Sequence, residues 1–277
     1  MYPTIKKGTP LYVSMSNELI RSAHGLTLGE KRLLMLAVSK LDSRKPATPQ
    51  NMITRIDVSE FVREFKITPQ TAYEEVKGAA EQLMNRYIRF FHNDKDGKEI
   101  ETRMQWVGEA NYKKSEGWVE LAFWHRLSPM LFELKERFTT YKLDRVGGLR
   151  SVYSWRLFEL LMQFKSTGQL KIDVDEFSQL MEAPKSIRAN FANLRIKVIE
   201  PAVKEIREKD GLKVKWKPIK AGRKVQTMVF TFPREQQVAL PLAEPKPAKL
   251  TKAYIEQHAH PGESYEQARQ RLSQNKK

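Results

Sequence analysis

Residues 56–61 read Ile-Asp-Val-Ser-Glu-Phe, and residues 172–177 read Ile-Asp-Val-Asp-Glu-Phe. The near-identity of these hexapeptides indicates that one structural unit occurs twice, and an internal repeat changes the fold that should be sought. In each copy, Ile-Asp-Val is typical of a short strand whose Asp caps the helix that carries Glu-Phe. Phe61 and Phe177 are therefore predicted to be buried in the two cores.

Amphipathic helices are predicted around each hexapeptide. Before the first copy, apolar residues recur at helical spacing from Leu26 to Val38, and Thr27 with Glu30 forms a capping box. The matching helix before the second copy covers Tyr153–Met162. After each hexapeptide, a turn with proline leads into another helix, since proline is tolerated in a first helical turn.

The last helix of each copy is predicted from apolar positions that recur 118 residues apart. In the first copy this helix runs from Thr68 to Arg89. Its Val76 and Ile88 correspond to Leu194 and Ile206 of the second copy. Each copy therefore contains helix, strand, helix and helix in that order.

A β-hairpin is predicted to close each copy, because two aromatic-rich strands flank a polar turn. The turns are Asn111–Gly117 in the first copy and Lys220–Lys224 in the second. This order of elements is that of a winged helix, a helix-turn-helix with a hairpin wing. We therefore predict an α+β fold of two tandem winged-helix domains, at residues 10–145 and 146–235. Residues 236–277 are predicted to be a linker, followed by a short helical or disordered tail.

The composition favours a polyanionic partner. The 277 residues include 49 Lys and Arg against 33 Asp and Glu, for a net charge of +16. Residues 185–224 alone hold 13 basic and 4 acidic side chains. A field of this sign favours nucleic acid. No apolar run approaches the ~18 residues of a membrane-spanning helix. The absence of cysteine excludes disulfides, thiol nucleophiles and cysteine-based zinc sites.

The last helix of the second copy, beginning at Lys185, is predicted to enter the major groove with its N-terminal residues. Arginine pairs bidentately with guanine, so Arg188 and Arg195 are predicted to read bases. Lys185, Ser186 and Lys197 are predicted to hold phosphates, helped by the helix N-terminus. The predicted contacts from this helix are Lys185, Ser186, Arg188, Asn190, Asn193, Arg195 and Lys197. The alternative is an exposed basic helix face without DNA contact.

The second hairpin is predicted to contact the DNA backbone or the minor groove. Three lysines alternate along its first strand and share one face, while Trp216 points to the other face and into the core. Three more cations lie at the tip. The predicted contacts of this wing are Lys213, Lys215, Lys217, Lys220, Arg223 and Lys224. They are predicted to contribute affinity, because phosphate contacts carry no sequence information.

The corresponding helix of the first copy is far less basic, so it is predicted to contact DNA weakly. The residues assigned to this secondary contact are Thr68, Gln70, Thr71 and Lys77. A protein–protein role for this half, as a dimerisation domain, fits its composition equally well. Trp106, Tyr112 and Trp118 are candidates for such an interface, although aromatic residues of this kind more often belong to a core.

Four segments in order carry a resemblance to a known family. The segments are Val13–Ile20 leading into Leu26–Glu30, Tyr153–Leu161, Phe191–Ile206 and Lys220–Phe232. Through them the chain resembles, over residues 10–235, the replication initiators of iteron-controlled, theta-replicating bacterial plasmids. In such relatives the basic side chains at the centre of the second recognition helix are often consecutive, whereas Ile196 separates Arg195 from Lys197 here.

The resemblance implies a cytoplasmic bacterial protein without enzymatic activity or cofactor, whose monomers bind direct repeats at a plasmid origin. It implies that dimers, formed mainly through the first domain, repress the protein's own gene and so limit copy number. Such initiators open adjacent AT-rich DNA and recruit the host initiator and the replicative helicase, while chaperones convert dimers to monomers. The expected partners are double-stranded DNA, a second copy of the chain and these host proteins, with no membrane.

Three other functions compete with this interpretation. A transcriptional repressor uses the same folds at an operator without an origin. A rolling-circle nicking enzyme needs a His-hydrophobic-His metal site and a tyrosine, which His258, His260 and Tyr265 offer. These histidines lie beside Pro261-Gly262 with few apolar neighbours, whereas that chemistry needs a buried strand. No phosphate-binding loop motif supports ATP hydrolysis. An RNA binder would accept single strands and prefer a 2′-hydroxyl.

Overall fold

The computed structural model describes residues 10–23, 25–235, 265–267 and 270. The chain divides into a compact unit of residues 1–236 and a second unit of residues 237–277. In the second unit, residues 265–267 are helical and Tyr265 is exposed. All elements named below belong to the first unit.

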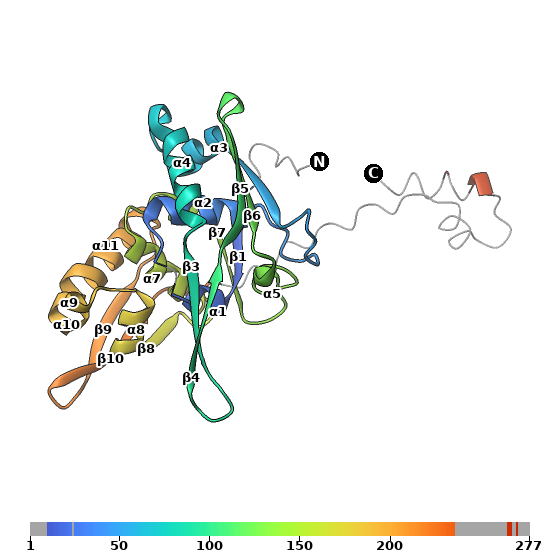
Figure 1. Cartoon of the computed structure of the whole chain (residues 1–277). Helices are drawn as coiled ribbons and strands as arrows, with labels where there is room; N and C mark the ends of the chain where they lie inside the picture. Colours follow the sequence, from blue (N-terminus) through green and yellow to red (C-terminus); the bar gives the residue numbers. More distant parts are fainter. Residues whose placement is uncertain (1–9, 24, 236–264, 268–269, 271–277) are drawn as a thin grey trace. The chain divides into compact units, whose positions relative to one another are not determined.

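We call residues 10–147 the first module. Its helices are α1 (Asn17–Arg21), α2 (Leu28–Ser39), α3 (Val58–Phe65), α4 (Pro69–Leu83), η1 (Lys114–Glu116), η2 (His125–Leu127), α5 (Ser128–Leu131) and α6 (Asp144–Gly147). Its strands are β1 (Tyr12–Ser16), β2 (Ile53–Asp57), β3 (Tyr87–Asn93), β4 (Glu99–Gln105), β5 (Val107–Lys113), β6 (Trp118–Phe123) and β7 (Phe138–Lys142). The strands pair antiparallel as a β2-β6-β5 sheet, a β1-β7 pair and a long β3-β4 hairpin (Figure 1).

We call residues 168–235 the second module. Its elements are β8 (Gln169–Asp173), α8 (Val174–Leu180), α9 (Lys185–Arg188), α10 (Phe191–Leu194), the π-helical η3 (Arg195–Ile199), α11 (Glu200–Lys209), β9 (Lys215–Ala221) and β10 (Lys224–Thr231). Its strands form one antiparallel sheet in the order β8-β10-β9. Helix α7 (Val152–Met162) packs against both modules, because its Trp155 ring lies 6.2 Å from Phe65 of α3 while other residues contact α11.

The two hexapeptides occupy equivalent places in the two modules. Ile56 of β2 and Ile172 of β8 are buried, and each strand leads directly into a helix. Phe61 and Phe177 in those helices are fully buried, as predicted. The sequence repeat is therefore a structural repeat, and both copies have the winged-helix order of elements when α7 is counted as the first helix of the second copy.

The predicted helix caps are confirmed at two of three positions. The capping box between Thr27 and Glu30 is present at the start of α2. Asp173 caps α8 by accepting hydrogen bonds from the backbone N–H groups of residues 175 and 176. The equivalent prediction for Asp57 is wrong, since its side chain makes no cap bond and instead accepts from Arg55 Nε at 3.3 Å.

The predicted helix from Thr68 to Arg89 is wrong at its C-terminal end. Helix α4 ends at Leu83, and Ile88 lies buried in β3. Ile88 and Phe90 alternate with exposed neighbours, which is strand periodicity and not the helical spacing inferred from the repeat. The β3-β4 hairpin has no counterpart among the described elements of the second module, so the match between Ile88 and Ile206 was coincidental.

A buried polar cluster joins α7 to the first module. Glu159 of α7 accepts hydrogen bonds from Lys31 Nζ of α2 at 2.8 Å and from the Tyr141 hydroxyl of β7 at 2.7 Å. Trp155 Nε1 donates to the same hydroxyl at 3.2 Å. Burial lowers the pKa of Lys31, and the attraction of Glu159 opposes this shift. Burial also raises the pKa of Tyr141 well above its ordinary value, so its hydroxyl remains a donor.

Candidate nucleic-acid interface

The helix predicted to begin at Lys185 is in fact two helices. Helix α9 ends at Arg188, and the next helix begins at Phe191. The Asn190 side chain accepts a hydrogen bond from the Ala192 N–H at 2.8 Å and caps this second helix. An Asn before an apolar residue is a helix-start signal, which the sequence analysis had assigned only to DNA contact.

We call the continuous helix formed by α10, η3 and α11 the recognition helix. Its centre is π-helical, an arrangement that inserts an extra residue into the turn and is frequent at functional sites. Leu194 and Val198 lie on the buried face. Arg195, Ile196 and Lys197 are all exposed. Three consecutive side chains of this π turn therefore face solvent, because Leu194 and Val198 on either side of them lie on the buried face.

Ile196 is a candidate contact that the sequence analysis missed. Its side chain is 54 % exposed between Arg195 and Lys197, and isoleucine is normally among the most buried residue types. An apolar side chain at such a position suits contact with a thymine methyl group. Arg195 is partly engaged, since its Nε lies 3.5 Å from Glu200 Oε1. The only sequence signal for Ile196 was its place between two cations.

Helix α9 presents its polar residues outward. Lys185, Ser186 and Arg188 are exposed, whereas Ile187 packs against the core. Asn193, on the recognition helix, is half-buried. The buried side of α9 thus holds this short helix in place beside the start of the recognition helix.

The second module's wing is the β9-β10 hairpin. Its turn is Gly222-Arg223, and Gly222 has a φ of 60°, which favours glycine. Lys215 and Lys217 are exposed, while Trp216 between them is half-buried against the core, as predicted. The wing therefore separates a basic outer face from an aromatic inner face.

The predicted cations of this module are almost all available to a ligand. Arg195 alone among them has an ion-pair partner within the described part of the chain. The cations without such a partner are Lys185, Arg188, Lys197, Lys213, Lys215, Lys217, Lys220, Arg223 and Lys224. Figure 1 shows α9, α10 and the wing gathered at the lower left of the molecule. Unpaired cations in this density attract a polyanion.

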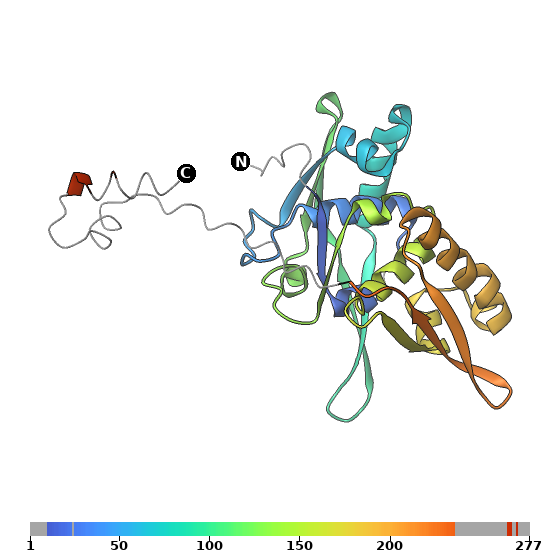
Figure 2. The ribbon, with the colours of Figure 1, turned by 180° about the vertical axis from the view of Figure 1, so that it is seen from behind.

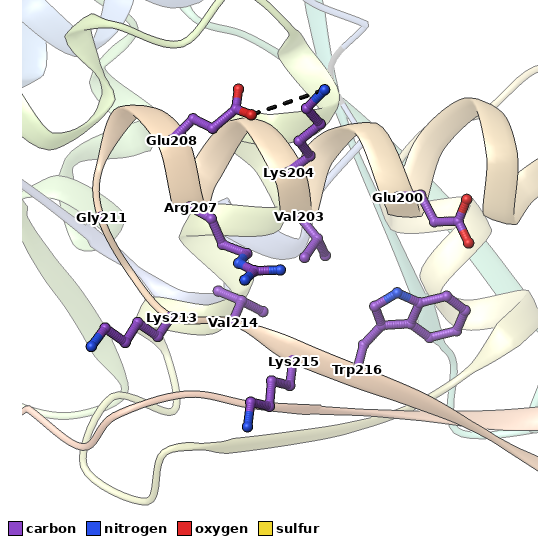
Figure 3. A pocket seen from close by; sticks show the side chains of 10 residues that line it. All are labelled: Glu200, Val203, Lys204, Arg207, Glu208, Gly211, Lys213, Val214, Lys215 and Trp216. Atoms are coloured by element: carbon purple, nitrogen blue, oxygen red, sulfur yellow. Dashed lines mark ion pairs between the residues drawn. The ribbon is translucent and has the colours of Figure 1, made fainter.

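A groove of about 930 Å³ lies between α11 and β9 (Figure 3). The groove is lined by Glu200, Val203, Lys204, Arg207, Glu208, Gly211, Lys213, Val214, Lys215 and Trp216. Arg207, Lys213 and Lys215 line it without an acidic partner among the described residues, so its rim suits an anionic backbone. Arg207, on α11, lies outside the residues predicted from the sequence to contact DNA.

The first module offers a weaker electrostatic surface. Thr68, Gln70 and Thr71 are exposed near the start of α4, but Lys77 is half-buried and pairs with Glu81 at 3.6 Å. Helix α4 carries three Glu and one Lys. Figures 1 and 2 show α4 and α9 along the same side of the molecule. The first module can therefore add polar contacts beside the second module but little attraction.

The aromatic candidates of the first hairpin lie mainly in the core. Trp106 is buried, and Tyr112 packs against the core. Trp118 is half-buried, with the Arg55 guanidinium 4.6 Å from its ring centroid. This arrangement leaves little aromatic surface for a partner on that hairpin.

Removal of one wing cation should weaken DNA binding without changing sequence preference. Lys215→Ala is expected to reduce affinity for specific and unrelated duplexes alike, and to lower the slope of log affinity against log salt by about 0.9, because one phosphate contact is lost. Fluorescence anisotropy at several salt concentrations measures both quantities. Lys135→Ala removes the same charge from an exposed loop of the first module and should leave the slope unchanged. A change of base preference in Lys215→Ala would contradict the phosphate assignment.

Two other kinds of site find no support in the described residues. No group of three or more His, Asp or Glu side chains there could hold a metal ion. No helix in that part of the chain is long and apolar enough to cross a membrane. His258 and His260, considered above for a nicking reaction, lie outside the described residues.

Comparison with known proteins connects the interface to a family. Residues 12–162 match the family model described as "Initiator Replication protein, WH1", and residues 173–232 match "Initiator Rep protein, WH2". A "Replication initiation protein" of Escherichia coli is 26% identical over 236 residues, which cover 83% of this chain and 72% of that protein. An uncharacterised 27.6 kDa protein of Escherichia coli is 29% identical over 219 residues, covering 76% and 91%.

A solved structure agrees with the winged-helix assignment. The Pi initiator protein, crystallised in complex with iteron DNA, superimposes with a TM-score of 0.70 at 23% identity. The match covers 82% of this chain and 99% of that one. With the two family models placed on the two modules, the chain belongs to the family of initiator replication proteins that contain two winged-helix domains.

Proposed function

We propose that the chain initiates plasmid replication by binding direct repeats at the origin. The observation that carries the proposal is the set of exposed, unpaired cations on α9, the recognition helix and the wing. Family membership supplies the role in initiation, and the relative crystallised with iteron DNA makes direct repeats the expected target. The protein acts in the cytoplasm by binding, without catalysis of its own.

In this proposal the recognition helix reads the sequence. Arg195 pairs with a guanine, Ile196 contacts a thymine methyl group, and Asn193 pairs with an adenine. To contact the base, Arg195 must first break its ion pair with Glu200. Breaking this pair costs little free energy, because both side chains are about half exposed. Arg188 of α9 reads a further base, while Lys185, Ser186, Lys197 and the cations of the wing hold phosphates and fix the register on the duplex.

The first module has two further roles in this proposal. Its α4 adds a secondary DNA contact through Thr68, Gln70 and Thr71, with Lys77 at the margin. The same module joins two copies into a dimer that represses the chain's own gene, in equilibrium with an active monomer. The host initiator, the replicative helicase and chaperones are the proposed protein partners.

A nuclease footprint on the DNA that flanks the chain's own gene tests the proposal. Purified protein is added at two salt concentrations, and protection of several direct repeats on one helical phase is expected. Protection should fade at the higher salt, since phosphate contacts dominate affinity. Protection of a single inverted repeat would favour a plain repressor. A strand break in place of protection would overturn the proposal and favour a nicking enzyme.

A further inference from the structure

The turn between α8 and α9 has a backbone conformation that glycine usually adopts. Glu182 in this turn has a φ of 50°, in a region that residues with a Cβ occupy rarely. Its N–H donates to the Gln179 carbonyl oxygen at 2.8 Å and ends α8. Helix α9 begins three residues later. This turn separates α8 from α9. Lys66 at the end of α3 has a similar φ of 51°, so the turn conformation is shared by both copies, and the second copy differs in the contacts that surround the Glu182 side chain.

Those surrounding contacts come from outside the second module. The Gly25 backbone N–H lies 3.0 and 2.9 Å from the two carboxylate oxygens of Glu182. Arg89 Nη2 of β3 lies 3.4 Å from Oε1. Arg156 Nη1 of α7 lies 3.2 Å from Oε2. One carboxylate thus contacts the loop before α2, the base of the β3-β4 hairpin and α7.

Arg156 closes the same junction from the buried side. Its side chain is only 4% exposed. It donates to the Ser22 carbonyl oxygen of the first module at 3.0 Å and to the Leu180 carbonyl oxygen at the end of α8. A buried guanidinium is costly without an anionic partner, so the Glu182 carboxylate is needed here. On the surface, Arg21 of α1 and Glu176 of α8 form a further ion pair across the junction.

We propose that Glu182 is a positioning residue that fixes the distance and rotation between the DNA-contacting surfaces of the two modules. The inference rests on the proposed function, because it requires both modules to contact one duplex. One base pair advances a binding site by roughly 3.4 Å and rotates it by roughly 34°. Hydrogen bonds of about 3 Å tolerate much smaller displacements than this. We call the contacts of Glu182 with Gly25, Arg89 and Arg156 the clamp, and the DNA segment that each module contacts its half-contact. The clamp therefore makes the protein selective for the number of base pairs between the two half-contacts.

The test uses the full chain and a duplex selected from a random pool. Hydroxyl-radical footprinting and base substitution first assign the half-contact of each module. Affinities are then measured for this duplex and for a variant with one base pair inserted between the half-contacts. The quantity compared is the ratio of the two affinities. A smaller active fraction of protein lowers both affinities equally, so a merely destabilised variant leaves this ratio unchanged.

The affinity of the wild type is expected to fall about 100-fold when one base pair is inserted, because only one module can then contact its half of the site in full. Glu182→Gln keeps the shape of the side chain but removes its charge. The affinity of this variant is expected to fall only about tenfold when the base pair is inserted. Arg89→Gln changes a half-exposed partner without disturbing Arg156, and it should shift the ratio in the same direction by less. Glu101→Gln breaks an exposed ion pair with Arg103 inside the hairpin and should match the wild type.

Two results would overturn the inference. If Glu182→Gln and Arg89→Gln both keep the wild-type ratio, the clamp does not set the spacing, although the proposed function stands. If the wild type protects the half-contact of one module only, the positioning role fails, although the proposed function stands. If it selects no duplex, the proposed function itself fails and the positioning role fails with it.

Discussion

Glu159→Ala is expected to lower the free energy of unfolding by about 3–5 kcal/mol, the usual cost of breaking a buried ion pair from one side. The change leaves the Lys31 ammonium buried without its carboxylate and leaves the Tyr141 hydroxyl without its acceptor. Both side chains of the ion pair are at most 3% exposed, so water cannot replace the lost partner. Urea denaturation followed by tryptophan fluorescence measures the difference, and Trp155 in the same cluster provides a local signal.

The double variant Lys31→Met/Glu159→Leu separates the cost of a lone charge from the value of the pair. Replacing a buried ion pair with apolar residues is often neutral, so this protein should regain most of the lost stability. A residual loss of about 1–3 kcal/mol is expected because the Tyr141 hydroxyl proton no longer has an acceptor. Adding Tyr141→Phe should not restore this loss, because the buried Trp155 Nε1 then loses its own hydrogen bond to that hydroxyl. A double variant as unstable as Glu159→Ala would show that packing in this cluster, and not charge, dominates.

Arg195→Ala is expected to weaken binding to the selected duplex by about 1–3 kcal/mol and to relax preference at one base position. The loss of a bidentate guanine contact affects the matched duplex far more than an unrelated one. Affinities for duplexes with each base substituted in turn locate the affected position. Arg126→Ala removes an exposed arginine from η2 of the first module and should change neither quantity.

Glu200→Gln tests the contact of Arg195 with DNA in a second way, because it removes the charge that holds Arg195 in the free protein. In the free protein, the Glu200 carboxylate competes with DNA for Arg195. Neutralising the carboxylate should therefore tighten specific binding slightly, with base preference unchanged. If Arg195→Ala leaves base preference intact, the recognition helix has a different register in the groove, and the assignment of Ile196 fails as well.

Local patterns accounted for much of this fold. The hexapeptide repeat, the capping box of α2 and the buried Phe61 and Phe177 all follow from signals within one turn or one strand. The alternation around Trp216 likewise places lysines on one face of the wing and the ring on the other, because strand geometry allows no other outcome. The α+β class and the tandem winged helices were predictable for this reason.

Errors arose where one local pattern was extended by analogy with the other copy. The repeat suggested that Ile88 continues a helix, but the Ile88–Phe90 alternation belongs to an inserted hairpin. The same analogy made one helix of the segment after Lys185, although Asn190 starts a new one. A helix signal and a cap signal compete at such positions, and tertiary packing decides between them.

The two copies, the order of their elements and the concentration of cations in the second copy could all be predicted from local sequence. These properties depend on residues that are close together in the chain, where backbone geometry leaves few alternatives. The contact of Lys31 with Glu159 across 128 positions, and that of Glu182 with Gly25 across 157, follow from the three-dimensional packing alone. The π-helical turn at Arg195–Ile199 was also not predictable from the sequence. Such contacts depend on how the modules pack, and no periodicity along the chain encodes which distant side chains will share one buried site.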